Sequence, residues 1–223
     1  MQGVSSIVGG FYRDGPTGMT QRPRILIATT NRGKADEFVD LLPFDVELVT
    51  LRDLGIDAPD EPGASFAENA TIKALAGNQA SGLITIADDS GICVDALNGA
   101  PGIFSARYAG KEASDADNRA KLLSDLTAST GDERNAHFEA SVVVAHDNTI
   151  VAIGTGRTYG RIFEYERGSH GFGYDSIFQL PDGRTMAELP AEMKNRISHR
   201  SKAVAEVIPA LTGLLKTLPG SAS

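Results

Sequence analysis

The sequence has a single cysteine, no tryptophan, no long hydrophobic run and little positive charge. With Cys93 alone, neither an internal disulfide framework nor a cysteine-rich zinc site can form. No apolar stretch approaches the ~18 residues of a membrane span. The 21 Lys and Arg are outnumbered by 29 Asp and Glu, and the net charge of −8 argues against a protein that grips nucleic acid through bulk positive charge. We therefore expect a cytoplasmic protein that acts on a small metabolite.

The chain nevertheless has enough apolar residues for a large core. Its 223 residues are 41% hydrophobic and 22% charged, which is ordinary for a globular protein. Residues 1–23 are rich in Gly, Ser, Thr and Pro without sustained periodicity, so we predict a flexible N-terminal extension. Residues 24–218 are expected to form one domain with two lobes, followed by a tail over 219–223.

Short apolar runs alternate with segments of helical character. Three runs are typical of buried strands: 24–29, 44–51 and 83–87. Four segments have helical spacing, capping signals or helix-forming composition: 34–42, 65–80, 114–126 and 200–218, the last containing Pro209 as an expected kink. Two further runs, 138–145 and 149–155, flank Asp147-Asn148 and predict a β-hairpin. This order predicts an α/β fold with a mixed sheet, in which residues 135–180 form an antiparallel lobe.

The turn between the first strand and the first helix predicts an anion site. The segment Thr29-Thr30-Asn31-Arg32-Gly33-Lys34 would direct backbone N–H groups of a helix N-terminus toward a ligand. Gly33 would permit close approach, and Lys34 adds a mobile positive charge. It is not a Walker A loop, because the first glycine and the final Ser or Thr of that pattern are absent. The alternative is a plain turn capped by Asn31.

Two adjacent acids, Asp88 and Asp89, follow the third apolar run and precede Ser90 and Gly91. Carboxylate oxygens suit Mg²⁺, a hard cation. Because successive strand side chains point to opposite faces, only one of the pair should reach a given site while the other fixes the loop. The alternative is an ordinary Asp-rich turn.

A second acidic cluster consists of Asp57, Asp60 and Glu61 in a loop, followed on the next helix by Glu68 with Asn69 and Lys73. A capping box with Ser65 already accounts for Glu68. The other three acids have an equally simple explanation as solvated loop charges.

Two later segments have the composition of a ligand pocket. In Gly171-Phe172-Gly173-Tyr174-Asp175, two glycines bracket an aromatic ring that would lie against a flat base, unless the segment is a core bulge. Residues 194–202 gather basic side chains, which would either bind an anion or form a solvated face. His137 and His146 lack ligand spacing, so we expect them to be structural or exposed. Cys93 has no His nearby in the sequence, so we expect a small buried apolar residue rather than a nucleophile.

Five stretches together resemble one known family. They are TTNRGKADEF, SFAENATIKA, ADDSGICVDALNGAPGIFSARYAG, GFGYDSIF and MAELPAEMKNRISHRSKA. In this order they are similar to the inosine triphosphate pyrophosphatase family, the Ham1-like enzymes that hydrolyse non-standard purine nucleoside triphosphates. The resemblance implies an elongated mixed α/β sheet with helices, two lobes around a central cleft, and normally a homodimer.

The resemblance also implies roles for single residues. Thr29 to Lys34 would hold the triphosphate, and Ser90 would contact the substrate. Asp89 would be the general base and would also bind Mg²⁺, with Asp60 as the second metal-binding acid. The nucleobase and substrate pocket would consist of Phe172, Gly173, Tyr174, Asp175, Lys194, His199 and Arg200.

The expected activity is metal-dependent hydrolysis of ITP, dITP or XTP to the monophosphate and pyrophosphate. Three alternatives stay open at this point. The first is an enzyme that prefers a different base, such as a modified pyrimidine, and the second is a nucleotide sensor without turnover. A nucleic-acid-binding module is supported by residues 194–202 alone, against the net charge of −8, and we expect neither nucleic acid nor a membrane as a partner.

Overall fold

The computed structural model of this protein describes residues 22–218. Most of the predicted extension over 1–23, and the predicted tail over 219–223, lie outside the described residues. None of the described helices is long and apolar enough to cross a lipid bilayer.

The described chain alternates strands and helices as expected. Its strands are β1 (Arg24–Ile27), β2 (Glu47–Thr50), β3 (Ile84–Val94), β4 (Asn135–His146), β5 (Thr149–Ile162) and β6 (Phe178–Gln179). Its α-helices are α1 (Arg32–Leu41), α2 (Phe66–Ser81), α3 (Asp115–Asp125), α4 (Ala191–Ile197) and α5 (His199–Thr217). Short 3-10 segments lie at Asp95–Leu97, Gly102–Arg107, Gly131–Arg134 and Met186–Glu188.

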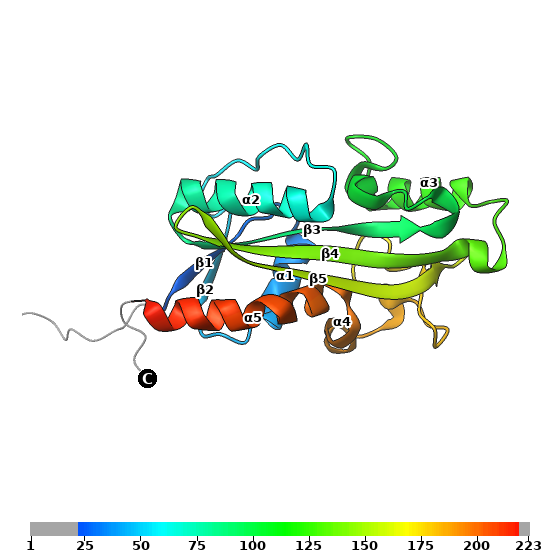
Figure 1. Cartoon of the computed structure of the whole chain (residues 1–223). Coiled ribbons are helices and arrows are strands. Elements are labelled where there is room, and N and C mark those ends of the chain that lie inside the picture. Colours follow the sequence, from blue (N-terminus) through cyan, green and yellow to red (C-terminus); the bar gives the residue numbers. More distant parts are fainter. Residues whose placement is uncertain (1–21, 219–223) are drawn as a thin grey trace, which may run out of the picture.

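One mixed sheet of six strands, in the order β2-β1-β3-β4-β5-β6, organises the fold. The strands β2, β1 and β3 are parallel, because helices connect them, whereas β3 to β6 pair antiparallel. Figure 1 shows the long strands β3, β4 and β5 running the length of the molecule, with α2 and α3 on one side and α5 on the other. The predicted mixed α/β fold is therefore confirmed.

The hydrophobic core follows the strand alternation. On β1, Ile25 and Ile27 pack with Phe38 and the inner face of α5, while Leu26 packs with α2 on the opposite face. A third cluster lies toward the other end of the sheet, where Ile92 and its neighbours pack against α3. Apolar contacts thus secure both ends of the long strands, and polar groups occupy the middle.

Several elements differ from the sequence prediction. The third strand does not end at residue 87 but continues through Asp88 and Asp89 to Val94, because β4 pairs with it from Val142 at Asp88 to Ala136 at Val94. The predicted hairpin forms, with longer strands than expected. Helix α4 was not predicted, since its seven residues are too few to give a periodic signal. The last helix stays helical through Pro209.

Candidate active site

The two adjacent acids of β3 point to opposite faces of the sheet, as strand geometry predicts. Asp88 lies beside Lys34 (2.7 Å from Nζ) and Arg200 (3.1 Å from Nη2), which come from α1 and α5. Asp89 faces α2, where it accepts hydrogen bonds from Asn69 and Lys73, both at 3.2 Å. The two carboxylates therefore belong to two different charge clusters.

The first cluster lies between β3 and α2. The Lys73 ammonium contacts Asp89 and also Glu61, at 3.3 Å. Burial raises the pKa of the Asp89 carboxyl, against the opposing effect of Lys73. A buried carboxylate that binds protons more readily than usual is typical of a general base.

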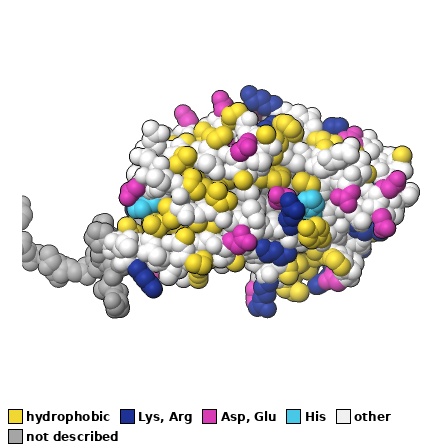
Figure 2. All heavy atoms as spheres, in the orientation of Figure 1, with side chains coloured by type: hydrophobic (Ala, Val, Ile, Leu, Met, Phe, Trp, Pro, Cys, Tyr) yellow, Lys and Arg dark blue, Asp and Glu magenta, His cyan; other side chains and the backbone are white. Residues whose placement is uncertain are grey.

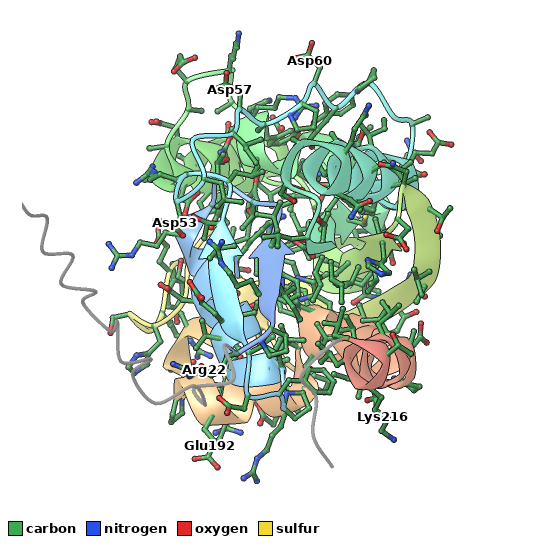
Figure 3. The ribbon with its side chains drawn as sticks, turned by 90° about the vertical axis from the view of Figure 1, so that its left-hand side faces the viewer. Arg22, Asp53, Asp57, Asp60, Glu192 and Lys216 are labelled. Carbon is green, nitrogen blue, oxygen red and sulfur yellow. The ribbon has the colours of Figure 1, made fainter. Side chains whose placement is uncertain are left out.

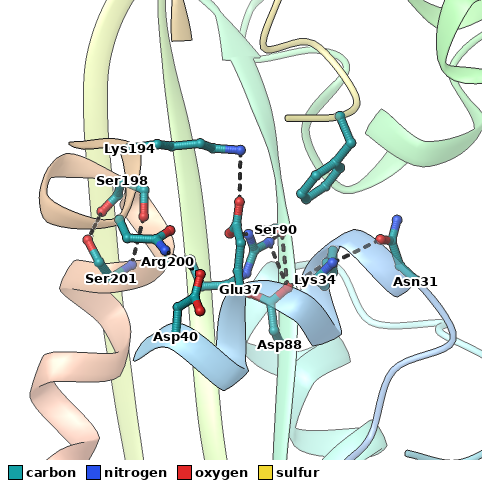
Figure 4. Close-up of polar contacts among 12 residues, drawn as sticks. Asn31, Lys34, Glu37, Asp40, Asp88, Ser90, Lys194, Ser198, Arg200 and Ser201 are labelled. Carbon is teal, nitrogen blue, oxygen red and sulfur yellow. Dashed lines mark hydrogen bonds and ion pairs between the residues drawn. The ribbon is translucent and has the colours of Figure 1, made fainter. Parts of the chain in front are cut away.

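The second cluster contains three cations and three acids, namely Lys34, Lys194, Arg200, Glu37, Asp88 and Asp175. Figure 4 labels all of them except Asp175. Besides its contacts with Lys34 and Arg200, Asp88 accepts a hydrogen bond from Ser90 at 3.1 Å. Glu37 of α1 pairs with Arg200 and with Lys194, the latter at 2.8 Å. Lys194 also contacts Asp175 at 2.5 Å. The cluster connects four segments that are far apart in the sequence.

Opposite charges keep two acids of this cluster, Asp88 and Glu37, ionised, whereas burial raises the pKa of Asp175. Burial by itself would raise the pKa values of Asp88 and Glu37, but Arg200 lowers both, with help from Lys34 on Asp88 and from Lys194 on Glu37. Burial lowers the pKa of Lys34, and Asp88 partly offsets that effect. An oppositely charged neighbour thus limits the cost of taking each of these charges out of water.

An aromatic ring lies over this second cluster. Lys194 Nζ lies 4.8 Å from the centre of the Phe172 ring. A Cβ atom added to Gly33 would come within 2.6 Å of Phe172 Cδ1, so the close approach permitted by this glycine is to the ring. On α3, Arg119 donates to the carbonyl of Gly173 (2.8 Å), and Asp115 accepts from its N–H (2.7 Å). Helix α3 therefore fixes the loop that presents Phe172.

One pocket joins the two clusters. The predicted site residues that line it are Thr29, Thr30, Asn31, Lys34, Asp89, Ser90, Phe172, Gly173, Tyr174, Asp175, Lys194, His199 and Arg200. At its base, His199 stacks on Phe138 with ring centres 4.8 Å apart. Burial holds the pKa of His199 well below its usual value, so its ring is neutral.

Comparison with known proteins gives this pocket a context. The model of the Ham1 family matches residues 25–210. The chain belongs to the Ham1 family. A dITP/XTP pyrophosphatase of Haemophilus influenzae is 46% identical over 187 residues, which cover 82% of this chain and 96% of the relative. A dITP/XTP pyrophosphatase of Leifsonia xyli subsp. xyli is 46% identical over 203 residues, covering 89% and 99%.

Solved Ham1 structures have the same fold. A HAM1 protein from Coxiella burnetii superimposes with a TM-score of 0.77 at 38% identity, covering 86% of this chain and 99% of that one. A structure described as a nucleoside-triphosphatase / dITP/XTP pyrophosphatase from Mycobacterium abscessus gives a TM-score of 0.65 at 41% identity, covering 83% and 99%.

One acid of the implied Ham1 site, Asp60, lies outside the pocket lining, so its predicted metal-binding role stays a prediction. Asp60 is exposed, and its side chain points away from the molecule in Figure 3. Its neighbour Glu61 lines the pocket and contacts Lys73. The loop is held just beyond this point, where Asn69 accepts a hydrogen bond from the N–H of Gly63 at 2.8 Å. Glu61 is therefore the loop acid that accompanies Asp89.

Two predicted phosphate-loop residues also lie outside the pocket lining. The Arg32 side chain is 95% exposed and lies 3.9 Å from Asp36, one helical turn away. Gly33 packs beneath Phe172, as described above. Asn31 caps α1 by accepting the N–H of Lys34 at 3.0 Å, so the turn acts as a helix cap while its neighbours line the pocket.

Sequence reasoning missed the roles of Glu37 and Lys73. Both have a weak signal, which is helical spacing. Glu37 follows Lys34 by three positions on α1, and Lys73 follows Asn69 by four on α2, so each shares a helix face with a neighbour that contacts β3.

Proposed function

We propose that this chain hydrolyses non-standard purine nucleoside triphosphates, namely ITP, dITP and XTP, to the monophosphate and pyrophosphate. The observation that carries the proposal is one pocket in which a buried acid of raised pKa, Asp89, lies across β3 from a cluster of paired charges with an aromatic ring, Phe172, over it. The relatives named dITP/XTP pyrophosphatases support the same reaction. The Ham1 fold covers both halves of this pocket.

In this proposal the triphosphate lies along the N-terminal end of α1. The side chains of Thr29, Thr30 and Asn31 line the pocket there, and Lys34 reaches it from the first turn of the helix. The free N–H groups and dipole of a helix N-terminus favour an anion. Lys73 supplies a second ammonium on the side of Asp89.

Asp89 acts as the general base. Its carboxylate takes a proton from the water that attacks the α-phosphorus, forming a new P–O bond. The bond from the α-phosphorus to the bridging oxygen breaks, and pyrophosphate leaves with that electron pair. A positioned base typically contributes about 10²–10⁴-fold to the rate.

Asp89 and Glu61 fit the requirements of Mg²⁺. Both are acidic oxygen donors in the same pocket, and one ammonium, that of Lys73, balances only part of their charge. Mg²⁺ usually takes one or two carboxylates together with substrate phosphate oxygens, so a larger protein cage is unnecessary. When bound, the ion supplies neutralisation of charge on the phosphates.

Base selection rests on hydrogen-bond polarity. Inosine and xanthosine present a 6-keto acceptor, whereas adenine presents a 6-amino donor. Lys194 has three N–H donors, of which Asp175 and Glu37 engage two, so one is left for a keto oxygen. The 6-amino group of adenine would face this N–H donor to donor, so both groups would lack an acceptor, and each unpaired group weakens binding by about 1–3 kcal/mol. Lys194→Ala should therefore lower turnover of ITP more than turnover of ATP.

The test measures pyrophosphate release from ITP, XTP, GTP and ATP, with Mg²⁺ and with EDTA. We expect metal-dependent release that is about a hundredfold faster for ITP and XTP than for ATP, because the Lys194 donor and the adenine amino group would each be left unpaired. Release without base preference, or faster release from dUTP or dTTP, would contradict the proposed substrate class. Nucleotide binding without turnover would instead indicate a sensor. Asp89→Asn serves as the inactive control.

We also propose that the protein works as a homodimer in the cytoplasm. Hydrophobic side chains gather between α2 and α5 on the face shown in Figure 2. Val151 and Ile153 of β5 are 38% and 50% exposed, and exposed apolar surface of this kind favours association. Light scattering of the full chain tests this, because a monomeric mass at working concentration would contradict it.

A further inference from the structure

A sulfur, a nitrogen and an oxygen ligand meet outside the nucleotide pocket. Cys93 on β3 is the direct cross-strand partner of His137 on β4, and Glu139 lies two residues farther along β4 on the same face. One ligand atom from each residue lies within 4.8 Å of the other two. None of the three lines the pocket that holds Asp89.

The spacing of two of these ligands already matches a bound metal ion. His137 Nε2 lies 3.4 Å from Glu139 Oε2. Zinc holds a histidine nitrogen at ~2.0–2.1 Å and a carboxylate oxygen at ~2.0–2.2 Å, and at a tetrahedral angle these atoms are about 3.4 Å apart. A thiolate at ~2.3 Å from the ion would lie about 3.6 Å from each of them. A shift of the Cys93 sulfur by about 1 Å therefore completes the three-ligand geometry.

The surroundings hold the ligands without blocking them. Arg157 on β5 donates through Nε to Glu139 Oε2 at 2.7 Å. A carboxylate oxygen has two lone pairs. Arg157 uses one of them and thereby fixes the orientation of the carboxylate, and the second lone pair is left for a metal ion. The side chains of His137 and Glu139 are 20% and 19% exposed, which leaves a route from solvent.

We propose that Cys93, His137 and Glu139 form a zinc site distinct from the carboxylates of the catalytic pocket. Thiolate and imidazole are ligands that Zn²⁺ favours, whereas Mg²⁺ selects oxygen. The thiol proton passes to solvent as the ion binds, and water fills the fourth position. Cys93 is four residues from Asp89 along β3, about 13 Å at the usual rise, so the ion lies beyond reach of the reacting phosphate.

The strand pairing gives the ion a structural effect. It would link β3 to β4 at the point where Cys93 also forms a bridge with Pro101, beside the 3-10 segment Gly102–Arg107. Zinc would therefore stabilise the part of the sheet that supports one wall of the nucleotide pocket. This role does not depend on the proposed reaction.

The experiment titrates Zn²⁺ and Co²⁺ into the metal-free full chain. Asp89→Asn is used as the parent, so that the catalytic acid does not contribute to the count. We expect one equivalent of Zn²⁺, and a thiolate-to-cobalt charge-transfer band in the near ultraviolet when Co²⁺ replaces it. Cys93→Ser and His137→Gln should each weaken binding by at least about tenfold, and the serine variant should also lose the band. His146→Gln is the matched control, because His146 lies on the same strand beside Asp147.

Thermal unfolding gives a second readout. Zn²⁺ should raise the Tm of the parent and of His146→Gln, and at the same concentration it should raise that of Cys93→Ser by less, since an ion that binds the native state stabilises it to an extent that rises with its affinity. If Cys93→Ser fails to fold, His137→Gln decides. Absence of the cobalt band in the parent would overturn the proposal and leave His137, Glu139 and Arg157 as an ion-pair network. Zinc affinity in Cys93→Ser and His137→Gln equal to that of the parent would overturn it too.

Discussion

Exchanging Asp88 for Asn should lower the stability of the protein, whereas exchanging Asp89 for Asn should lower its activity without lowering its stability. The Asp88 side chain is fully buried between Lys34 and Arg200. Asp88→Asn removes the charge that both cations share in a place where water cannot replace it. Removing one partner from a buried ion pair costs about 3–5 kcal/mol. Because the amide oxygen of Asn still accepts one hydrogen bond, we expect a loss near the lower limit, about 3 kcal/mol.

Asp89→Asn should behave differently, although the residue is next in sequence. Burial raises the pKa of Asp89, which means that its ionised form is less favourable in the folded protein than in the unfolded chain. A neutral Asn removes that cost, and Lys73 retains Glu61 as a partner. The free energy of unfolding should therefore stay the same or rise, while kcat for ITP falls by about 10²–10⁴-fold.

Urea unfolding and ITP turnover of the two variants test this contrast. Asp36→Asn is the control, because Asp36 is an exposed acid whose ion pair with Arg32 spans 3.9 Å. Such surface pairs contribute about 0–1 kcal/mol. The reasoning fails if Asp88→Asn unfolds like the control, or if Asp89→Asn is the less stable of the pair. Two acids of equal effect would mean that the alternation of β3 does not separate their roles.

Three further predictions follow from single contacts. Glu61→Gln should lower kcat/KM for ITP at least about tenfold, whereas Asp60→Asn should leave it unchanged, as initial rates in Mg²⁺ will show. Gly33→Ala should raise KM for ITP by about two- to tenfold, because the new Cβ displaces the ring of Phe172. His199 is neutral when folded and gains a proton near pH ~6.5 when unfolded. The free energy of unfolding should therefore reach its maximum above that pH and decrease below it by up to ~1.4 kcal/mol per pH unit. His199→Gln should make the free energy of unfolding less dependent on pH in this range.

Elements with a strong local signal were predicted well from the sequence. The helix over 65–80 has a capping serine, Ser65, whose side chain accepts the N–H of Glu68 as expected. The Glu68 carboxylate accepts the N–H of Ala64 instead of that of Ser65, so only half of the predicted capping box forms. The extent of β3 was not predictable in the same way. Its polar residues 88–91 have low strand propensity, and pairing with β4 decides their conformation.

The choice between Asp60 and Glu61 shows a second limit of sequence reasoning. Both are acids in one loop, and neither helical nor strand periodicity applies there. The contacts that accompany Glu61 in the pocket come from α2, where Lys73 pairs with it and Asn69 accepts the N–H of Gly63. The partners of Asp88 were missed for a similar reason, because Arg200 is 112 residues away along the chain.

The charge balance around β3 explains why such a pocket should need a divalent ion. On the side of Asp88, three cations meet three acids, so that cluster offers no net charge to a polyphosphate. On the side of Asp89, one ammonium faces two carboxylates, which leaves an excess of one negative charge. A triphosphate brought against these groups would meet repulsion unless a cation joined the acids. Strong dependence on Mg²⁺ is therefore expected from the protein's own charges, and the EDTA arm of the turnover assay tests that expectation separately from base preference.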